Sequence, residues 1–200
     1  MLLKICGITR EEDARYVAMC GVDFIGAIHV ESSKRFVTIE QAKNIFAVAK
    51  PAKSVLVVRD MELEKLQAII DDIHPYAVQL HGHESVDYAT NLKGVKIWKA
   101  FNVNTLNNLQ KVLDYPADMI VADSGGGTGK TCDWTRAAEL ARHRSIFLAG
   151  GITPENVQKA IATVHPVGID MAGGVESAPG IKDHEKIKKI SMKMQRLRPL

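Results

Sequence analysis

Eight short apolar runs, each followed by a segment whose apolar residues have helical spacing, extend along the whole sequence. The runs favour buried strands and occupy residues 2–6, 24–29, 54–58, 77–81, 96–101, 119–123, 146–149 and 168–171. Strict alternation of strand and helix predicts a parallel sheet, and eight strands are the number that closes a (β/α)₈ barrel. We therefore predict an α/β fold, a TIM barrel formed as one domain over residues 1–200. An open doubly wound sheet is the alternative.

Helix start and stop signals support this division of the chain. Thr9–Glu12 and Thr38–Gln41 each fit a capping box, so we expect the first two helices to begin there. The third helical segment should stop at His74–Pro75, because the residue before a proline avoids helical geometry. Asp133 is predicted to cap the sixth helix, and Thr153–Pro154 to open the seventh with a cap and a first-turn proline.

Composition narrows the class of protein. A chain of 200 residues, 46% hydrophobic and 24% charged, predicts a soluble globular protein with one sizeable core. The net charge is only +3, and the basic residues near the C-terminus fit the solvated face of an amphipathic helix, so we expect no nucleic-acid partner. The N-terminus does not fit a signal peptide, and no apolar run approaches the roughly 20 residues that span a bilayer. We expect a cytoplasmic protein without membrane contact.

The three cysteines, Cys6, Cys20 and Cys132, are an odd number without CxxC spacing. This pattern argues against a disulfide framework and against a zinc site. His81 and His83 are two residues apart but have no nearby acidic cluster, and we interpret them as polar loop residues. We therefore predict no metal.

Glycine clusters follow three of the predicted strands, the sixth, the seventh and the eighth. In a barrel, the loops at these positions commonly bind phosphate through backbone N–H groups. The candidate phosphate ligands are Gly126, Gly127, Gly129, Gly150, Gly151, Gly173 and Gly174. Tight turns alone would also explain any one cluster. The first cluster comes within one residue, Ser124, of a nucleotide-binding P-loop, which makes a nucleotidase a rival but less favoured interpretation.

Cys6 and Asp123 are the candidate catalytic pair. Cys6 is the last residue of the first predicted strand, and Asp123 is the last residue of the sixth. Both would lie at the carboxyl end of the barrel, where catalytic residues are found. A thiol can act as a base where cations lower its pKa, and a carboxyl can act as an acid in an apolar site. Packing of the thiol in the core, and local capping by the aspartate, are the structural alternatives.

Several motifs occur together in a specific order from the first strand to the last helix. They are Lys4–Thr9 (KICGIT), Ser32–Val37 (SSKRFV), Val78–Glu84 (VQLHGHE), Asp123 with Gly126–Lys130 and Asp133–Trp134, Leu148–Ile152 (LAGGI), and Gly174–Glu176 (GVE) with Pro179–Gly180 and Lys182–Asp183. In this order the motifs resemble those of the phosphoribosylanthranilate isomerase family of tryptophan biosynthesis.

The resemblance implies a (β/α)₈ barrel that needs no metal or coenzyme. It implies an Amadori rearrangement of N-(5′-phosphoribosyl)anthranilate to the deoxyribulose 5-phosphate isomer. Asp123 would be the general acid that opens the furanose ring, and Cys6 the general base that removes the C2′ proton. Arg35 would contact the anthranilate side, Gln79 and Asp170 would position the substrate, and the glycines would hold its phosphate. The expected partner is a small phosphosugar, and the expected assembly is a monomer or homodimer.

The sequence departs from the family pattern at several places near the predicted site. Ala172–Gly173 stands where two serines are usual, which removes hydroxyl donors from the phosphate loop. Ala27, His29 and Arg59 also replace residues that are common in the family. The acid and base are both retained. These departures leave open the alternative of a phosphate-binding barrel of divergent or lost isomerase activity that serves as a binding or regulatory protein.

Overall fold

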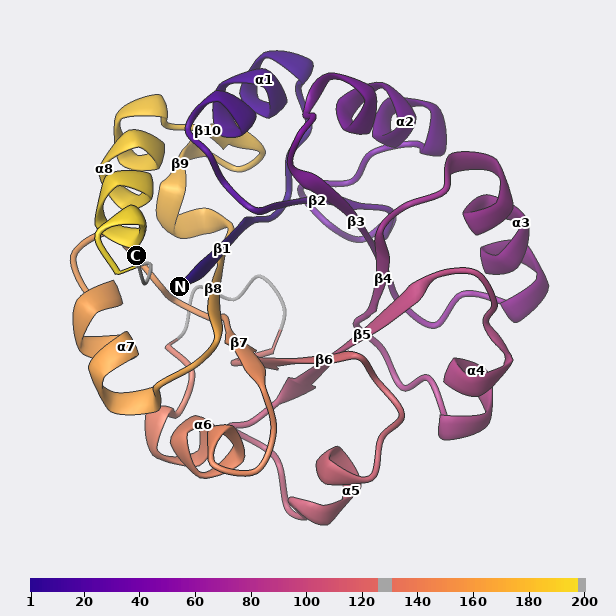
Figure 1. The fold of residues 1–200 in the computed structure, drawn as a ribbon. Coiled ribbons are helices and arrows are strands. Elements are labelled where there is room, and N and C mark those ends of the chain that lie inside the picture. Colours follow the sequence, from indigo (N-terminus) through magenta and orange to yellow (C-terminus); the bar gives the residue numbers. More distant parts are fainter. Residues whose placement is uncertain (126–130, 198–200) are drawn as a thin grey trace.

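The computed structural model describes residues 1–125 and 131–197. Its eight strands β1 to β8 close into one parallel barrel in sequence order, with β1 paired to both β2 and β8. The helices form a ring outside the strands (Figure 1). The predicted (β/α)₈ barrel is therefore confirmed, and the open sheet is wrong.

The strand boundaries lie within one or two residues of those predicted from the apolar runs. The strands are β1 (Leu2–Ile5), β2 (Phe24–Ile28), β3 (Lys53–Val58), β4 (Ala77–Leu80), β5 (Lys96–Asn102), β6 (Met119–Asp123), β7 (Ile146–Leu148) and β8 (Gly168–Met171). The helices are α1 (Glu11–Met19), α2 (Ile39–Val48), α3 (Leu63–Ile73), α4 (Val86–Asn91), α5 (Gln110–Leu113), α6 (Trp134–Ala141), α7 (Val157–Val164) and α8 (His184–Gln195).

Successive side chains of each strand point alternately outward and inward, which divides the core into two parts. Outward-facing strand residues such as Leu3, Ile25 and Leu56 pack with the helices in one large apolar cluster. Inward-facing residues at the amino end of the barrel, including Phe24, Trp98 and Phe147, fill the interior in a second cluster. Their rings meet edge-on or tilted, with centroids 4.8 to 5.7 Å apart. The barrel is thus plugged at one end, and a ligand site is confined to the carboxyl end.

Capping geometry confirms some of the predicted helix boundaries. Thr38 and Gln41 form the predicted capping box at α2. Asp133 accepts hydrogen bonds from the backbone N–H groups of Thr135 and Arg136 at the start of α6. The predicted stop of α3 is also present, because His74 ends this helix in the left-handed conformation.

Of the two other capping predictions, one is wrong and one is confirmed. The N-cap of α1 is Arg10, which makes no side-chain cap, because the Thr9 hydroxyl donates instead to the Gly180 carbonyl, 2.6 Å away. The cap predicted at Thr153 is present, because its hydroxyl accepts hydrogen bonds from the backbone N–H groups of Glu155 and Asn156. Its carbonyl accepts from the N–H of Val157, where the regular helix α7 begins. A tertiary contact therefore outweighed the sequence signal at α1, whereas the cap predicted before α7 formed.

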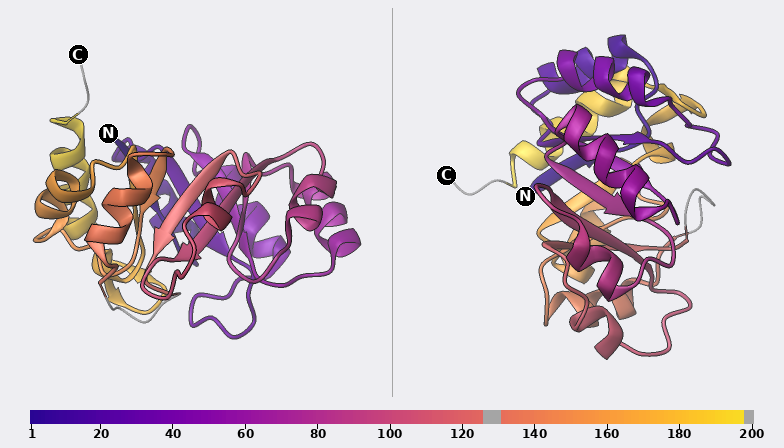
Figure 2. Two further views of the ribbon diagram at one scale, coloured as in Figure 1. Left: turned by 90° about the horizontal axis from the view of Figure 1, so that it is seen from below. Right: turned by 90° about the vertical axis from the view of Figure 1, so that its right-hand side faces the viewer.

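A short antiparallel hairpin after β8 was not predicted. A 3₁₀ turn, η1 (Gly173–Val175), leads into strands β9 (Glu176–Ala178) and β10 (Ile181–Lys182). This hairpin lies at the end of the barrel opposite the N-terminus (Figure 2). It brings Glu176 and Lys182 to the carboxyl end of β1. Among the described residues, no helix is long and apolar enough to cross a membrane.

Candidate active site

A cavity of about 620 Å³ opens at the carboxyl ends of the barrel strands. Nine of the residues predicted from the sequence line it, and they come from strands far apart in the chain. They are Cys6, Arg35, Gln79, Asp123, Gly150, Gly151, Asp170, Gly173 and Gly174. The remaining three, Gly126, Gly127 and Gly129, lie outside the described residues. The fold therefore gathers every described member of the predicted set around one space.

Cys6 follows β1 directly, and its side chain is only 7% exposed. Burial raises the pKa of its thiol, and the neighbouring Lys4 ammonium opposes this effect. Lys4 is completely buried and forms an ion pair with Asp170, with Nζ 2.8 Å from Oδ2. The other carboxylate oxygen of Asp170, Oδ1, is buried without a hydrogen-bond partner among the described residues. The thiol thus stands beside a cation and next to a carboxylate with one unused acceptor.

Asp123 ends β6, and its carboxylate contacts Ser124 and His81. Its Oδ1 accepts a hydrogen bond from the Ser124 backbone N–H at 2.6 Å, and its Oδ2 lies 3.1 Å from Nε2 of His81. His81 follows β4, and its Nδ1 lies 3.4 Å from the amide nitrogen of Gln79. The Oε1 atom of Gln79 is buried without a partner among the described residues. The carboxylate therefore contacts an imidazole in the cavity, and that imidazole in turn contacts an amide.

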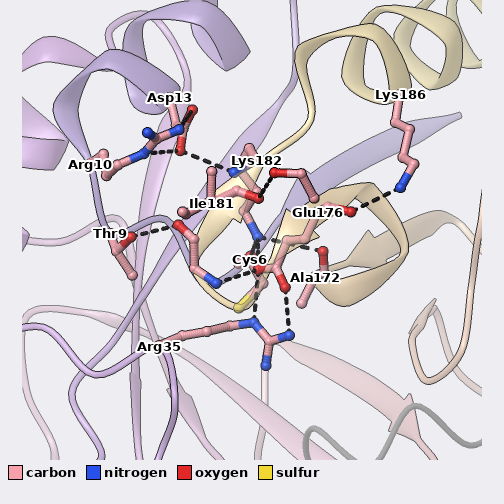
Figure 3. Close-up of polar contacts among 12 residues, drawn as sticks. Cys6, Thr9, Arg10, Asp13, Arg35, Ala172, Glu176, Ile181, Lys182 and Lys186 are labelled. Carbon is pink, nitrogen blue, oxygen red and sulfur yellow. Dashed lines mark hydrogen bonds and ion pairs between the residues drawn. The ribbon is translucent and has the colours of Figure 1, made fainter.

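Arg35 is held over the cavity by the β9–β10 hairpin (Figure 3). Its guanidinium donates from Nε and Nη2 to the two carboxylate oxygens of Glu176, at 2.8 and 2.6 Å. The Lys182 ammonium donates to the same carboxylate at 2.7 Å and to the Cys6 carbonyl at 2.6 Å. The bidentate pair uses Nε and Nη2, so Nη1 is left outside it. This network fixes the position of Arg35 relative to the thiol.

Burial alone would raise the pKa of the Glu176 carboxyl, but the hydrogen bond from Arg35 and the charge of Lys182 outweigh it, and the pKa is lowered. Burial lowers the pKa of Lys182, an effect that Glu176 only partly offsets. The carboxylate form of Glu176 is therefore favoured in the folded protein.

The glycine loops after β6, β7 and β8 touch one another. Gly150 has a φ of +80°, and a Cβ atom there would lie 2.5 Å from Oγ of Ser124. A Cβ atom on Gly174 would lie 1.9 Å from the backbone carbonyl oxygen of Ile152. Side chains at either position would push the loops apart. The close approach of backbone to backbone explains why glycine stands at both positions and places the predicted phosphate ligands together.

The rival P-loop interpretation gains no support from the helix that follows it. A P-loop helix begins at the Gly-Lys-Thr sequence, whereas α6 begins at Trp134 after the Asp133 cap. Within residues 1–125 and 131–197, no group of three or more His, Cys, Asp and Glu side chains could hold a metal ion.

Three site residues were missed from the sequence. His81 was interpreted as a loop residue, but it continues the inward-facing series of Ala77 and Gln79 and so enters the cavity. The same two-residue period links Lys4 to Cys6 and could have identified it. Glu176 gave no such signal because its contact with Arg35 spans 141 positions. His83, by contrast, has a side chain that is 96% exposed.

The closed barrel, with a polar cavity at the carboxyl ends of its strands, has the architecture of a TIM-barrel enzyme. Residues 3–193 match the family described as N-(5′phosphoribosyl)anthranilate (PRA) isomerase. The chain therefore belongs to the N-(5′-phosphoribosyl)anthranilate isomerase family.

Individual relatives agree with this assignment. The chain is 37% identical to the N-(5′-phosphoribosyl)anthranilate isomerase of Microcystis aeruginosa, with 99% of each chain covered. It is 40% identical to the tryptophan biosynthesis protein TrpCF of Haemophilus influenzae, and 92% of this chain matches 41% of that longer protein.

Solved structures of the family superpose closely on the barrel. The phosphoribosyl anthranilate isomerase of Thermus thermophilus has a TM-score of 0.92 and 33% identity, with 99% of this chain and 100% of that chain covered. A phosphoribosyl anthranilate isomerase in complex with reduced 1-(o-carboxyphenylamino)-1-deoxyribulose 5-phosphate has a TM-score of 0.87 and 32% identity, with 98% and 100% covered.

Proposed function

We propose that this protein converts N-(5′-phosphoribosyl)anthranilate to 1-(2-carboxyphenylamino)-1-deoxyribulose 5-phosphate, a step of tryptophan biosynthesis, with Asp123 as general acid and Cys6 as general base. The observation that carries the assignment of roles is the meeting of both groups in one cavity, on β1 and β6 of the barrel. Each has a different neighbour, since a lysine ammonium accompanies the thiol and an imidazole accompanies the carboxylate.

The reaction needs one proton delivered and one removed. The protonated Asp123 donates to the furanose ring oxygen while the C1′–O bond breaks, and the nitrogen lone pair forms the C=N bond of a Schiff base. The Cys6 thiolate then removes the proton from C2′. The released electron pair forms the C1′=C2′ bond and neutralises the nitrogen, which gives an enolamine. Transfer of the hydroxyl proton to C1′ completes the ketone.

The remaining residues would bind the parts of the substrate that do not react. Arg35 would pair with the anthranilate carboxylate through the guanidinium nitrogen that Glu176 does not use. Oε1 of Gln79 and Oδ1 of Asp170 are buried acceptors without partners among the described residues, which suits them to sugar hydroxyls.

The phosphate would bind to the glycine loops. Gly150, Gly151, Gly173 and Gly174 line the cavity, and contacts between their loops support one shared phosphate site. The proposal extends to Gly126, Gly127 and Gly129, which lie outside the described residues. We also propose that the protein is cytoplasmic and is a monomer or homodimer. Cell fractionation would test its location, and light scattering would test its assembly.

The test is turnover of purified protein with N-(5′-phosphoribosyl)anthranilate, followed by the loss of anthranilate fluorescence. Cys6→Ala and Asp123→Asn should each lower kcat by about 10²-fold or more. Cys20→Ala is the control, because Cys20 does not line the cavity and should leave the rate unchanged. Absence of turnover in the wild type, or undiminished turnover in both variants, would refute the assignment. Failure to complement an isomerase-deficient tryptophan auxotroph would favour a binding or regulatory protein instead.

A further inference from the structure

Lys4 is the largest fully buried polar side chain of the barrel interior, with 0% exposure. Lysines are almost never fully buried unless they are paired, because removal of an ammonium from water is costly. The acid and base steps proposed above assign no role to this charge. Its position therefore calls for an explanation beyond the packing of the core.

Strand geometry places Lys4 next to the thiol. Lys4 and Cys6 are two residues apart at the end of β1, so both point into the barrel. Lys4 is also opposite Asp170 in the parallel pairing of β1 with β8. Gly26 on β2 marks their proximity, because a Cβ built there would lie 2.7 Å from Sγ of Cys6 and 3.2 Å from Nζ of Lys4. Both atoms thus lie against the same point of β2, close enough for the charge of the ammonium to act on the thiol.

We propose that Lys4 is a positioning residue for the reaction, whose ammonium stabilises the Cys6 thiolate while the Asp170 carboxylate anchors that ammonium beside it. The proposal rests on the role of Cys6 as the general base. It assigns a second task to Asp170, whose Oδ2 binds Lys4 while Oδ1 is left for the substrate.

Other charged groups also face Cys6, but they are committed elsewhere. Lys182 donates to Glu176 and to backbone carbonyls, including that of Cys6 itself. Arg35 is paired with both oxygens of Glu176. Among the described residues, Asp170 is the carboxylate whose charge raises the pKa of the thiol, and it therefore disfavours the thiolate. Lys4 is therefore the cation best placed to offset both Asp170 and burial.

The pKa of the Cys6 thiol lies above its ordinary value, so the role of Lys4 is to limit this rise. Burial raises the pKa of the thiol, and Lys4 is the strongest influence that lowers it. Burial alone would lower the pKa of Lys4, but the charge of Asp170 and the contact with Cys6 outweigh it, so the pKa of Lys4 is raised. Lys4 thus keeps its proton when Cys6 takes one from C2′. The S–H bond forms at the thiol, and the ammonium does not act as a base.

The experiment measures the thiol without substrate. Wild type and variants are alkylated with iodoacetamide at a series of pH values, and the rate for the Cys6 peptide is followed by mass spectrometry. Because only the thiolate reacts, Lys4→Met should lower the rate at neutral pH by about tenfold or more. Asp170→Asn should raise the rate, because its amide oxygen can still accept the hydrogen bond from Lys4 while the negative charge that opposes the thiolate is removed. Structural damage alone would change the Cys6 alkylation rate of both variants in the same direction.

Lys99→Met is the matched control. Lys99 is also a buried barrel lysine with a carboxylate partner, Glu84, whose Oε2 lies 2.6 Å from Nζ. It does not line the cavity, so its loss should leave the Cys6 alkylation profile unchanged. An unchanged profile in Lys4→Met would overturn the proposal. If Lys4→Met does not fold, a rate in Asp170→Asn that is equal to or below that of wild type would overturn it. These rates do not depend on turnover, so failure of the proposed isomerase activity would be seen separately.

Discussion

Glu176→Gln is the substitution with the most readily calculated consequence. The Glu176 carboxylate accepts hydrogen bonds from Arg35, from Lys182 and from the backbone N–H of Gly180. A glutamine keeps the shape but removes the charge, and its amide NH₂ would face a cation. Two cations would then share a site without a carboxylate (Figure 3).

The size of the stability loss in Glu176→Gln follows from the burial of the three side chains. The Glu176 and Lys182 side chains are 5% and 0% exposed, and that of Arg35 is 14% exposed, so solvent screens the network little. Loss of one partner from a buried ion pair costs about 3–5 kcal/mol. For a chain of this length each 1 kcal/mol lowers Tm by about 2–4 °C, so the variant should melt on the order of 10 °C lower.

The stabilisation that Glu176 contributes should depend on pH, and the direction follows from the shift of its pKa. The pKa of Glu176 is lowered in the folded state, so its stabilisation is fully present above the ordinary glutamate value of about 4.3. It is lost as pH falls through the lower, folded-state value. The difference in unfolding free energy between wild type and Glu176→Gln should therefore be largest near neutral pH and shrink as the solution becomes more acidic than about pH 4.

Urea unfolding at several pH values measures this difference. Glu155→Gln is the control, because Glu155 forms an exposed pair with Lys189 and should change stability little. Under the proposed function, Glu176→Gln should also raise KM more than it lowers kcat, because Arg35 loses its anchor. A stability difference that stays constant from neutral to acid pH would show that the carboxylate charge is not its source.

Three further substitutions test other parts of the site. Gly174→Ala should destabilise the protein by about 1–3 kcal/mol and raise KM, because the Cβ of the alanine would collide with the Ile152 carbonyl. A variant with the KM and the stability of the wild type would contradict this prediction. His81→Asn should lower kcat about tenfold or more with little change in Tm, because it removes the imidazole beside Asp123. An unchanged kcat in steady-state kinetics would show that this contact has no part in turnover. Tyr115→Phe should lower the free energy of unfolding in urea by about 1 kcal/mol without altering kcat, because the buried Tyr115 hydroxyl donates to backbone carbonyls of the loop after β4. A lower kcat would show that this loop matters for turnover.

The sequence predicted the barrel and the strand ends because both follow from local periodicity. Cys6, Asp123 and Asp170 each stand at or near the carboxyl end of a strand, and closure of the sheet is sufficient to bring such residues to one rim. Their roles as base, acid and substrate ligand remain predictions, since the geometry shows proximity and not turnover.

Contacts between distant segments could not be predicted in the same way. The Thr9–Glu12 pattern has the residues of a capping box, but the hairpin carbonyl of Gly180 takes the threonine hydroxyl. That hairpin is made of two short strands, too short to show a period. Glu176 and Lys182 are polar residues on these strands, and only the tertiary structure reveals that they are buried.

The polar groups around the thiol and those around the carboxylate come from different parts of the barrel, which bears on how one small barrel can supply both an acid and a base. The thiol half is built from β1, β8 and the β9–β10 hairpin, where Lys4 and Asp170 surround Cys6. The acid half is built from β4 and β6, where His81 meets Asp123. Lys4, the cation that most opposes the rise in the thiol's pKa, and His81, the imidazole that contacts Asp123, therefore come from different parts of the barrel. Placement of the pair at the carboxyl ends of β1 and β6 therefore gives each group its own neighbours, which suits general acid and base catalysis of a single substrate by two residues.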